Sequence, residues 1–475
     1  MLLSSSLQNL YTTWAGSPPS KISPIGQASA SHRKYFRVEG SGGTVIGTTY
    51  DNAAENAAFL YLSRHFAEKG LPVPRILAES PDQSAYLQED LGDRSLYGEL
   101  EAGGFEFTPA IRDHYQKVVA LLPELQIKGH EGLDYSRCLV KEPFDQQAML
   151  WDLTYFKYYF LKILDIPFDE YSLERDFQVL SAWLGSARPH YFMHRDFQSR
   201  NILLPGGRHH FIDYQGGRPG PLQYDLVSLL WQAKAALPHP VRQALLEDYL
   251  DAATGLVSID REEFTGFYYG FALHRGLQVL GAYGLRGLVE KKSHFLESIP
   301  FALKNIQWLL EKIHWPVAMP ELRRVMQQPI PIKAPVKAGP GHPLAIQVQS
   351  FSYRKGIPED ESGHGGGFVF DCRGIENPGR LDPFKALTGL SPEVIEFLHH
   401  QTRMDAFLEH IFAAVSETVE NYIERDFDRL SISFGCTGGQ HRSVYAAERM
   451  AEFLKKKYGI VVSLRHLEES NWPAN

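Results

Sequence analysis

The sequence predicts a two-lobed α+β fold, with a small mixed lobe and a larger helical lobe, followed by a separate small α/β domain. Three observations predict it. A polar stretch from His194 to Asn201 is followed by a predicted hairpin and then by Asp213. Residues 316–343 contain seven prolines, a density that favours a stiff, extended linker. Beyond this linker, strand-like and helix-like segments alternate, which indicates a small α/β domain.

The composition permits a multidomain enzyme. The chain has 475 residues, enough for two or three domains, and its net charge of −8 argues against general binding of polyanions. It has no apolar run of about 18 residues and no secretory leader, so we expect a cytoplasmic protein without a membrane anchor. Cys138, Cys372 and Cys436 are widely separated and lack metal-ligand spacing. We therefore expect reduced thiols, without disulfides or zinc.

We expect the first lobe, residues 1–92, to be a small sheet with one helix. The helix begins at a capping box formed by Asn52 and Glu55 and ends at Gly70. The strands are predicted from apolar alternation and flanking turn residues at 34–38, 44–48, 71–76 and 86–92.

The larger lobe is predicted to span residues 93–315, with aromatic-rich apolar faces at helical spacing. Nucleotide is expected in the cleft between the two lobes, where such ligands commonly bind. The C-terminal domain is predicted to span residues 344–475. Its expected strands are 345–349, 368–371, 430–435 and 460–464, and its expected helices are 404–423 and 444–457.

The polar stretch His194 to Asn201 has the pattern H-x-D-x-x-x-x-N and supplies the parts of a phosphoryl-transfer site. In such sites one carboxylate orients the acceptor hydroxyl, while an Asn and a second Asp hold Mg²⁺ against the nucleotide phosphates. The hairpin between Asn201 and Asp213 brings these side chains together, so that one metal ion can contact both. A polar turn without function is the alternative, and the combined spacing argues against it. We therefore expect ATP and Mg²⁺ as cofactors.

Over residues 20–315 the order and spacing of these elements resemble the aminoglycoside phosphotransferase-like kinases. The chain is most similar to the sugar kinases of bacterial cell-wall recycling, which phosphorylate the anomeric hydroxyl of N-acetylmuramate or N-acetylglucosamine. This resemblance implies that Asp196 is the catalytic base, that Asn201 and Asp213 bind the metal, and that His194 holds the loop by hydrogen bonds. The motifs that carry it are 31–37, 88–93, 194–201, 212–217 and 220–230.

Asp225 follows the metal loop and opens a predicted helix. An acidic residue there stabilises a helix through its dipole and its free N–H groups, so we expect a structural role.

The phosphate-clamping lysine of protein kinases is missing, since no Lys occurs in residues 44–50. Strand alternation places Arg33 and Arg37 on one face and Lys34 on the other. We favour Arg37 or Lys34 as the replacement, and solvated strand charges are the alternative. The full set of candidate nucleotide-binding residues is Arg33, Lys34, Arg37, Gln88 and Asp90.

For the acceptor, a predicted helix at 144–164 aligns Asp152, Tyr155 and Tyr159 on one face. A carboxylate and a phenol can hydrogen-bond sugar hydroxyls, so Asp152 and Tyr155 are the candidate substrate residues. Core packing is the alternative. Another acceptor of the same fold, namely an aminoglycoside, choline or methylthioribose, also remains open.

A second polar segment joins a predicted buried strand to a predicted helix. Backbone N–H groups of its glycine-rich turn point into one concavity, to which Arg442 and Ser443 add donors. This predicts an anion cradle suited to phosphate, with a tight turn of no further role as the alternative. Its residues are Cys436, Thr437, Gly438, Gly439, Gln440, His441, Arg442 and Ser443.

The same segment also fits Cys-x5-Arg-Ser, the phosphate loop of cysteine phosphatases, in which Cys436 would be the nucleophile. Asp371 is the candidate acid for that reading.

Residues 344–468 resemble the C-terminal domain of the RNase adapter protein RapZ, through the cradle and the segments 351–358, 369–373 and 387–390. In that family the domain oligomerises, binds glucosamine-6-phosphate and contacts a small RNA. The resemblance therefore implies a sugar-phosphate ligand and a homo-oligomer. From residue 344 on there are 14 Lys and Arg against 19 Asp and Glu, which argues against RNA as a partner. We expect an amino-sugar kinase with a sugar-phosphate-sensing domain; a regulatory adapter that contacts RNA or protein is the alternative.

Overall fold

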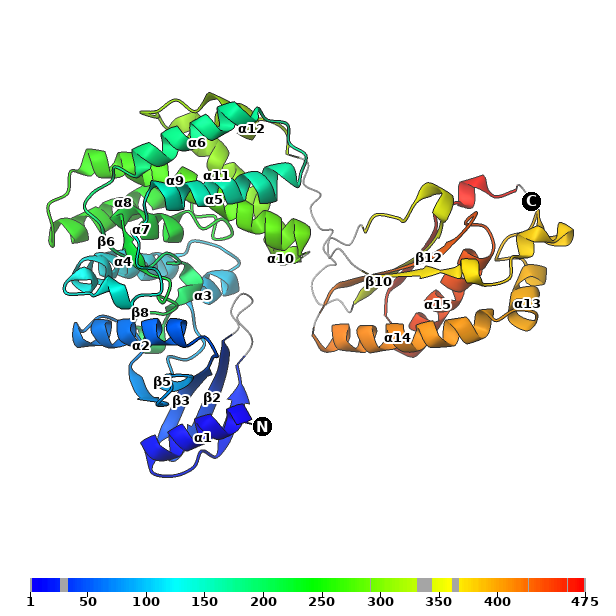
Figure 1. Ribbon diagram of the computed structural model, residues 1–475, viewed down its shortest axis with the longest axis horizontal. Helices are drawn as coiled ribbons and strands as arrows, with labels where there is room; N and C mark the ends of the chain where they lie inside the picture. The colour runs from blue at the N-terminus through cyan, green and yellow to red at the C-terminus, as the bar shows by residue number, and fades with distance from the viewer. Residues whose placement is uncertain are drawn as a thin grey trace. The chain divides into compact units, whose positions relative to one another are not determined.

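A computed structural model describes residues 2–25, 33–290, 292–330, 344–360, 367–425, 427–458 and 460–473. The chain divides into two compact units, residues 1–282 with 298–330 and residues 283–297 with 331–475 (Figure 1). Across these described ranges no helix combines the length and the apolarity needed to cross a membrane. The predicted fold class is confirmed: a sheet-rich small lobe and a helical lobe, with a separate C-terminal parallel sheet.

The small lobe is built on an antiparallel sheet in the order β1-β2-β3-β5-β4. Helix α1 (Leu2–Ala15) packs on β3, β4 and β5, and its side chains Leu7 and Tyr11 are fully buried. Neither this helix nor β1 was predicted. The strands are β1 (Lys21–Pro24), β2 (Lys34–Gly40), β3 (Gly43–Thr49), β4 (Ile76–Glu79) and β5 (Ala85–Glu89).

The strand predicted at 71–76 is wrong, because β4 begins only at Ile76. Pro72 and Pro74 have no N–H to donate to a neighbouring strand, and they keep this segment out of the sheet.

Helix α2 (Ala53–Glu68) begins as predicted, because the Asn52 side chain accepts a hydrogen bond from the Glu55 N–H at 3.2 Å. The helix also joins the small lobe to the large one. Ser63 lies 2.7 Å from the Tyr214 hydroxyl, and the Phe59 ring stacks on the Tyr214 ring at 5.2 Å. Tyr214 follows Asp213, so α2 packs directly against the predicted metal loop.

The large lobe is mainly helical and carries two short antiparallel strand pairs around the stretch 194–201. β6 (Tyr191–Met193) pairs with β9 (Arg218–Gly220), and β7 (Ile202–Leu203) pairs with β8 (His210–Phe211). Its helices are α3 (Leu96–Ala102), α4 (Pro109–Pro123), α5 (Gln146–Phe156), α6 (Glu170–Leu184), α7 (Leu222–Leu230), α8 (His239–Thr254), α9 (Arg261–Tyr283) and α11 (Ile299–Lys312). The short α10 (Ser293–Leu296) falls in the segment grouped with the second unit.

The expectation of an extended linker over 316–343 is wrong for its first half, which contains helix α12 (Pro320–Met326). Pro320 occupies the first turn, where a missing N–H costs nothing. The helix packs on α6 and α11, and Leu322 is fully buried. The Leu322 N–H also donates to the buried Asp176 carboxylate at 2.9 Å. Residues 331–343 of the predicted linker lie outside the described residues, as do residues 31 and 32 of the first kinase motif.

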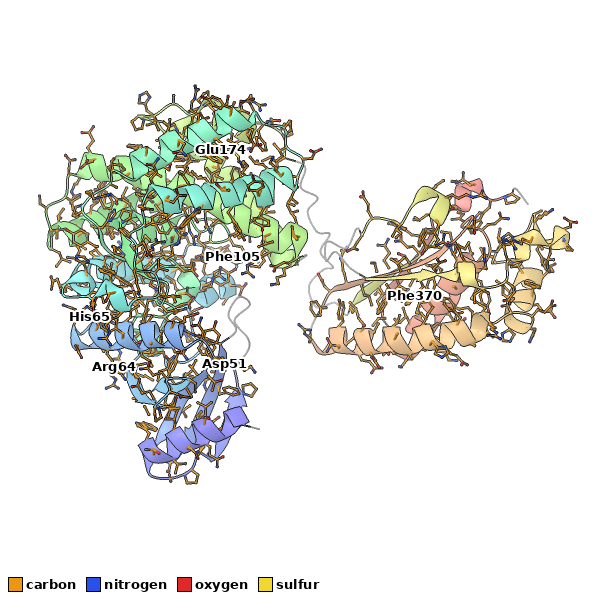
Figure 2. The ribbon with its side chains drawn as sticks, in the orientation of Figure 1. Asp51, Arg64, His65, Phe105, Glu174 and Phe370 are labelled. Atoms are coloured by element: carbon orange, nitrogen blue, oxygen red, sulfur yellow. The ribbon has the colours of Figure 1, made fainter. Side chains whose placement is uncertain are left out.

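The C-terminal unit contains a four-stranded sheet in the order β11-β12-β10-β13, and all its neighbouring strands are parallel. Helix α15 (Arg442–Tyr458) packs on β10, β12 and β13, and α14 (Met404–Glu424) packs on α15. Figure 2 shows Phe370 on β11, the outer strand of this sheet. The remaining elements are β10 (Ala345–Ser352), β11 (Gly367–Asp371), β12 (Arg429–Cys436), β13 (Val462–His466) and α13 (Pro392–His400).

Because α12 buries apolar surface, Leu322→Ala should lower the free energy of unfolding of the first unit by about 2–5 kcal/mol, the usual cost of such a cavity. Urea denaturation of the full chain would measure it. The matched control is Leu256→Ala, since Leu256 is 37% exposed. Equal losses for the two variants would contradict the packing of α12.

Candidate active site

The loop 194–201, which carries the candidate catalytic residue Asp196 and is called the catalytic loop below, follows β6. It is held by the buried carboxylate of Asp225 on α7. Asp225 accepts hydrogen bonds from the backbone N–H groups of His194 at 2.7 Å and of Arg195 at 2.9 Å. Burial raises the pKa of Asp225, while its electrostatic interaction with His194 and these backbone donors oppose the rise. The structural role expected for Asp225 thus has a different cause, because the carboxylate fixes the loop and not the start of its own helix.

Two further contacts reinforce the loop. Gln126 donates to Asp225 at 3.2 Å and accepts from the Tyr249 hydroxyl at 2.7 Å. The His194 ring donates from Nε2 to the Ile212 carbonyl at 3.0 Å, which ties the loop to the strand end before Asp213. His194 therefore has the hydrogen-bonding position expected of it.

The predicted catalytic base and the two predicted metal ligands lie close together. The Asn201 side-chain amide donates to the Asp196 carbonyl at 2.9 Å and lies 3.4 Å from both the Asp196 and the Asp213 carboxylates. The β7–β8 hairpin produces this arrangement, since Ile202 pairs with Phe211. Asp213 has a φ of 69°, a left-handed conformation that Asp adopts more readily than most residues.

Asp196 is partly exposed and is flanked by two donors. Arg275 from α9 lies 3.3 Å from its Oδ1, and the Gln198 amide donates to the same oxygen. The Arg275 side chain is only 11% exposed. A carboxylate held by a buried guanidinium stays oriented, as a proton acceptor requires.

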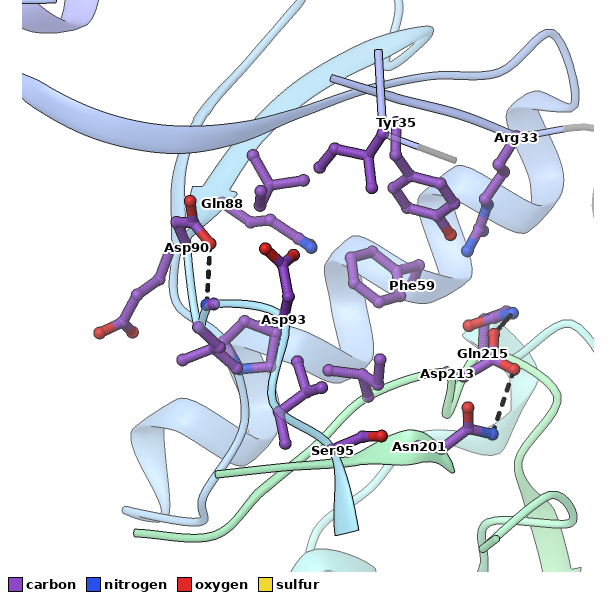
Figure 3. A pocket seen from close by; sticks show the side chains of 18 of the residues that line it. Arg33, Tyr35, Phe59, Gln88, Asp90, Asp93, Ser95, Asn201, Asp213 and Gln215 are labelled. Carbon is purple, nitrogen blue, oxygen red and sulfur yellow. Dashed lines mark hydrogen bonds between the residues drawn. The ribbon is translucent and has the colours of Figure 1, made fainter. Parts of the chain in front are cut away.

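The donor set fits a hard divalent cation. Asn201 carries an amide oxygen and Asp213 a carboxylate, and the Asn201 amide nitrogen lies 3.4 Å from that carboxylate, so the two side chains are neighbours. Such cations prefer oxygen ligands. The Gln215 amide donates to Asp213 Oδ1 at 2.7 Å and orients this carboxylate (Figure 3).

A cavity of about 760 Å³ between the lobes contains these residues. Of the five predicted nucleotide-binding residues, Arg33, Arg37, Gln88 and Asp90 line it, together with Asp196, Asn201 and Asp213. Lys34 does not line it, because it is exposed at the start of β2 and alternation directs it to the other face.

Arg33 occupies the part of this cavity nearest the metal loop. Its guanidinium lies 3.4 Å from the Glu55 carboxylate on α2 and over the Phe59 ring at 5.2 Å from the ring centre. In Figure 3, Arg33 and Tyr35 point from the small lobe toward Asp213 and Gln215. An Arg–Glu pair from sheet edge to helix has the form of the Lys–Glu pair of protein kinases.

Arg37 is engaged differently. It forms paired hydrogen bonds with Asp90 at 2.7 and 3.3 Å and with Asp93 at 2.9 and 2.7 Å. These bonds, from Asp93 and then Asp90, raise the pKa of Arg37 above its ordinary value. Arg37 therefore joins β2 to the segment between the lobes. The apolar walls of the cavity include Ile46, Pro74, Leu203 and Ile212.

The structure does not bring the two predicted substrate residues into this cavity. The Asp152 carboxylate accepts two hydrogen bonds of 2.9 Å from Arg195, and its side chain is 13% exposed. The Tyr155 ring packs on the Tyr159 ring at 4.7 Å. Asp152 thus orients the catalytic loop through Arg195.

Three contributors were missed by sequence reasoning. Glu55 was assigned only as a helix cap, although its spacing from Arg33 places it on the facing helix. Gln215 belongs to the motif 212–217, but no role was predicted for it. Arg275 lies in the middle of α9, and no sequence signal marks it, because its contact with Asp196 spans 79 residues.

The anion cradle lies at the carboxyl end of β12, where the chain turns into α15. The Cys436 sulfur is 3.1 Å from the Ser443 hydroxyl. Burial alone would raise the pKa of the Cys436 thiol, but hydrogen bonds from Ser443 and the charge of Arg442 lower it below its ordinary value. Thiolate character is therefore favoured here.

Arg442 is 4% exposed, and only some of its donor groups have hydrogen-bond partners among the described residues. Its Nη1 donates to the carbonyls of Arg373 at 3.1 Å and Ile375 at 2.7 Å, and its Nη2 lies 3.5 Å from the Thr437 hydroxyl. Its buried Nε has no hydrogen-bond partner among the described residues. One nitrogen of the guanidinium, Nη1, is thus anchored to the turn that follows β11.

The other cradle residues are held by neighbouring loops. Gln440 donates to the Leu387 carbonyl at 2.7 Å, and His441 donates to the Phe384 carbonyl at 2.9 Å. Trp472 donates to the Gly439 carbonyl at 3.2 Å. Gly438 stands between Thr437 and Gly439 in this turn. Asp371, the candidate phosphatase acid, is paired with Arg373 at 2.6 Å.

Curated relatives match only part of the chain. A nucleotide-binding protein of Dinoroseobacter shibae is 42% identical over 127 residues, which are 27% of this chain and 40% of that protein. One from Hahella chejuensis is 38% identical over 125 residues, 26% of this chain and 42% of that protein. The chain spans about two-fifths of the length of these two relatives.

Among solved structures, an amicoumacin kinase in complex with AMP-PNP, Ca²⁺ and Ami aligns with a TM-score of 0.48 at 14% identity, over 68% of this chain and 96% of that one. A choline kinase from Cryptosporidium parvum aligns with a TM-score of 0.45 at 15% identity, over 66% of this chain and 94% of that one.

Two family models match the chain. The model described as the RapZ C-terminal domain matches residues 344–469. The model described as the phosphotransferase enzyme family matches residues 21–265, more than half of the chain, and these residues contain the Asp196–Asn201–Asp213 cluster and the cavity between the lobes. The chain therefore belongs to the phosphotransferase enzyme family.

Proposed function

We propose that this chain is an ATP- and Mg²⁺-dependent cytoplasmic kinase that phosphorylates an amino sugar, N-acetylglucosamine or N-acetylmuramate, at the anomeric hydroxyl. The observation that carries the kinase chemistry is the convergence of Asp196, Asn201 and Asp213 in one cavity with the Arg33–Glu55 pair. A proton acceptor, oxygen ligands for a cation and a fixed cation for phosphate are the parts that phosphoryl transfer needs.

In this proposal Asp196 accepts the proton of the acceptor hydroxyl as its oxygen attacks the γ-phosphorus of ATP, and ADP leaves. Arg275 and Gln198 hold the Asp196 carboxylate toward the acceptor. Mg²⁺ held by Asn201 and Asp213 would neutralise charge on the phosphates. Arg33, positioned by Glu55, would clamp a phosphate in place of the missing strand lysine.

The amino-sugar acceptor is supported by the sequence around Asp213-Tyr214-Gln215, which resembles sugar kinases of cell-wall recycling. The C-terminal domain supports it independently, since a RapZ C-terminal domain is present and that family binds an amino-sugar phosphate. Aminoglycosides, choline and methylthioribose are the alternative acceptors.

A coupled assay of ADP release across these acceptors tests the proposal. We expect N-acetylglucosamine or N-acetylmuramate to give the highest kcat/KM, and Asp196→Asn to lower kcat by about 10³-fold or more with ATP affinity largely kept, because only the proton acceptor is lost. Far faster turnover of a kanamycin-type aminoglycoside would overturn the acceptor, and near-normal turnover by Asp196→Asn would overturn the mechanism.

The two neighbouring cations Arg33 and Lys34 form a matched pair. We expect Arg33→Ala to raise the KM for ATP by about 10–100-fold, the usual worth of a hydrogen bond to a charged group. Lys34→Ala should leave it unchanged, because Lys34 lies outside the cavity. Initial-rate kinetics at saturating acceptor would measure both, with circular dichroism to verify folding. Equal effects, or a larger effect of Lys34→Ala, would exclude Arg33 as the clamp.

We further propose that the cradle of the C-terminal domain binds a hexosamine phosphate as a sensor or an oligomerisation signal. The specific observation is the buried Nε of Arg442, which has no hydrogen-bond partner in the part of the chain that the structure describes, at the start of α15 directly after a glycine-rich turn. An arginine edge and a helix start are complementary to phosphate oxygens. RNA stays an alternative partner, and the acidic balance of the domain disfavours it.

The lowered pKa of Cys436 is compatible with the alternative function of a cysteine phosphatase. Asp371, the candidate general acid for that reaction, is already paired with Arg373. A sugar-phosphate sensor does not need the Cys436 thiol, whereas a phosphatase needs it as the nucleophile. The variants of Cys436 and Arg442 therefore separate the two functions.

We expect residues 344–475, which have their own apolar core, to bind glucosamine-6-phosphate in calorimetry. Arg442→Ala should abolish this binding, whereas Cys436→Ser should keep most of the affinity, since backbone N–H groups do the holding. Arg442 also donates to two carbonyls, so Arg373→Ala, which removes only an exposed side chain, serves as the folding control. Phosphate release from a test ester, lost in Cys436→Ser, together with no binding of any sugar phosphate, would replace the sensor with a phosphatase.

A further inference from the structure

Two of the three cysteines of the chain are neighbours at the cradle of the C-terminal unit. Strand β11 ends at Asp371, which pairs with Gly435 on β12, and these two residues are directly followed by Cys372 and Cys436. Neighbouring strands lie about 4.8 Å apart, and the Cα atoms of a disulfide lie about 4.4–6.8 Å apart. The register of the sheet therefore places the two cysteines at a separation that a disulfide can bridge.

Both cysteine side chains continue the apolar face of the sheet. Side chains alternate along a strand, so Cys372 follows Phe370 on one face of β11, and Cys436 follows Phe434 on one face of β12. The rings of Phe370 and Phe434 have their centres 5.4 Å apart, so the two strands present these side chains to the same side. Both cysteines belong to the apolar core there, and both are buried.

The two thiols differ in reactivity. Burial alone would raise the pKa of the Cys436 thiol, but hydrogen bonds from Ser443 and the charge of Arg442 lower it. Burial raises the pKa of the Cys372 thiol, and Cys436 raises it further, so the two groups lie within electrostatic range of each other. Because the thiolate is the nucleophile, an oxidant reacts first with Cys436 and leaves Cys372 as the neighbouring thiol. Hydrogen peroxide is a small oxidant that suits a residue only 3% exposed.

We propose that Cys436 and Cys372 form a peroxide-sensitive disulfide at the cradle. The Cys436 thiolate sulfur attacks one oxygen of hydrogen peroxide, the O–O bond breaks, and a sulfenic acid forms as hydroxide leaves. The Cys372 sulfur then attacks the sulfenic sulfur, the S–O bond breaks, and the Cys372 proton leaves with that oxygen as water. The hydroxide takes up the proton that Cys436 lost. Two thiols and one peroxide thus give one disulfide and two water molecules.

The disulfide and an anion compete for the cradle. Cys436 is the first residue of the cradle, so a hexosamine phosphate bound there covers its thiol. A bond to Cys372 in turn draws the Cys436 sulfur away from Ser443, whose hydroxyl lies 3.1 Å from it in the reduced state. This competition, unlike the disulfide itself, rests on the proposed sensing function. Oxidation then switches the sensor off, and bound ligand protects the thiol.

Peroxide treatment of the full chain, with peptide mapping and a count of free thiols, tests the disulfide. We expect two of the three thiols to be lost, in a pair of peptides joined through Cys372 and Cys436, and to be restored by dithiothreitol. Cys138 is the internal control, because it is also buried but lies in the other unit.

The rates of oxidation should differ in the same order. Burial raises the pKa of Cys138 to about 11, whereas the pKa of Cys436 lies below the ordinary value of 9.0. The thiolate fraction at pH 7 is therefore at least about 100-fold larger at Cys436. A more acidic thiol is also less nucleophilic, so we expect Cys436 to be oxidised at least about 10-fold faster than Cys138.

Variants of the three cysteines separate the two steps. Cys372→Ala removes only the second step, so dimedone should label a sulfenic acid at Cys436, and no joined peptides should form. Cys436→Ser should give neither product, and Cys138→Ala should behave as the unmodified chain does. Thermal unfolding would verify that each variant is folded. Oxidation of Cys436 no faster than that of Cys138, or a stable sulfenic acid without a disulfide in the unmodified chain, would overturn the inference.

Glucosamine-6-phosphate distinguishes the disulfide from the proposed sensor. At about ten times its Kd it should slow the oxidation of Cys436 about 10-fold, because it covers the thiol in about nine chains of ten. The oxidised chain should also bind it more weakly in calorimetry than the reduced chain. Binding that leaves the oxidation rate unchanged would overturn the competition. A reduced chain that binds no sugar phosphate but still forms the disulfide would overturn the proposed sensor and leave the disulfide standing.

Discussion

Both carboxylate oxygens of Asp225 are used inside the helical lobe to hold the backbone that carries Asp196. The loop turns through a left-handed residue, Arg195 at a φ of 76°, so its N–H groups need an acceptor away from regular structure. Asp225 supplies this acceptor, and Gln126 supports it. The geometry of the candidate site therefore depends on a residue that faces no ligand.

The local half of the site could be predicted from the sequence, because its geometry is set by a short hairpin. Asn201 and Asp213 are twelve residues apart, and pairing of the intervening strands brings them side by side. Contacts between distant elements could not be predicted in this way. The Arg33–Glu55 pair depends on how α2 packs on the sheet, and the Asp152–Arg195 pair spans 43 residues. Side-chain spacing on a helix identifies a face but not what that face meets.

The fold was predictable where periodicity and propensity agreed. The C-terminal strands alternate with amphipathic helices, and each expected element is present. Helix α1 escaped notice, because Ser4, Ser5 and Ser6 are weak helix formers, and burial of Leu7 and Tyr11 outweighs them. Helix α12 was rejected for its prolines, although a proline at the first helical turn is compatible with a helix.

The anchoring of Arg442 gives the cradle a mechanical property. Nη1 of the guanidinium donates to the carbonyls of Arg373 and Ile375 in the turn that follows β11, and Nη2 lies 3.5 Å from the Thr437 hydroxyl in the cradle. The side chain thus links the cradle to the turn that follows the edge strand β11. A ligand that moved this guanidinium would also move the turn, because the two carbonyls are hydrogen-bonded to it.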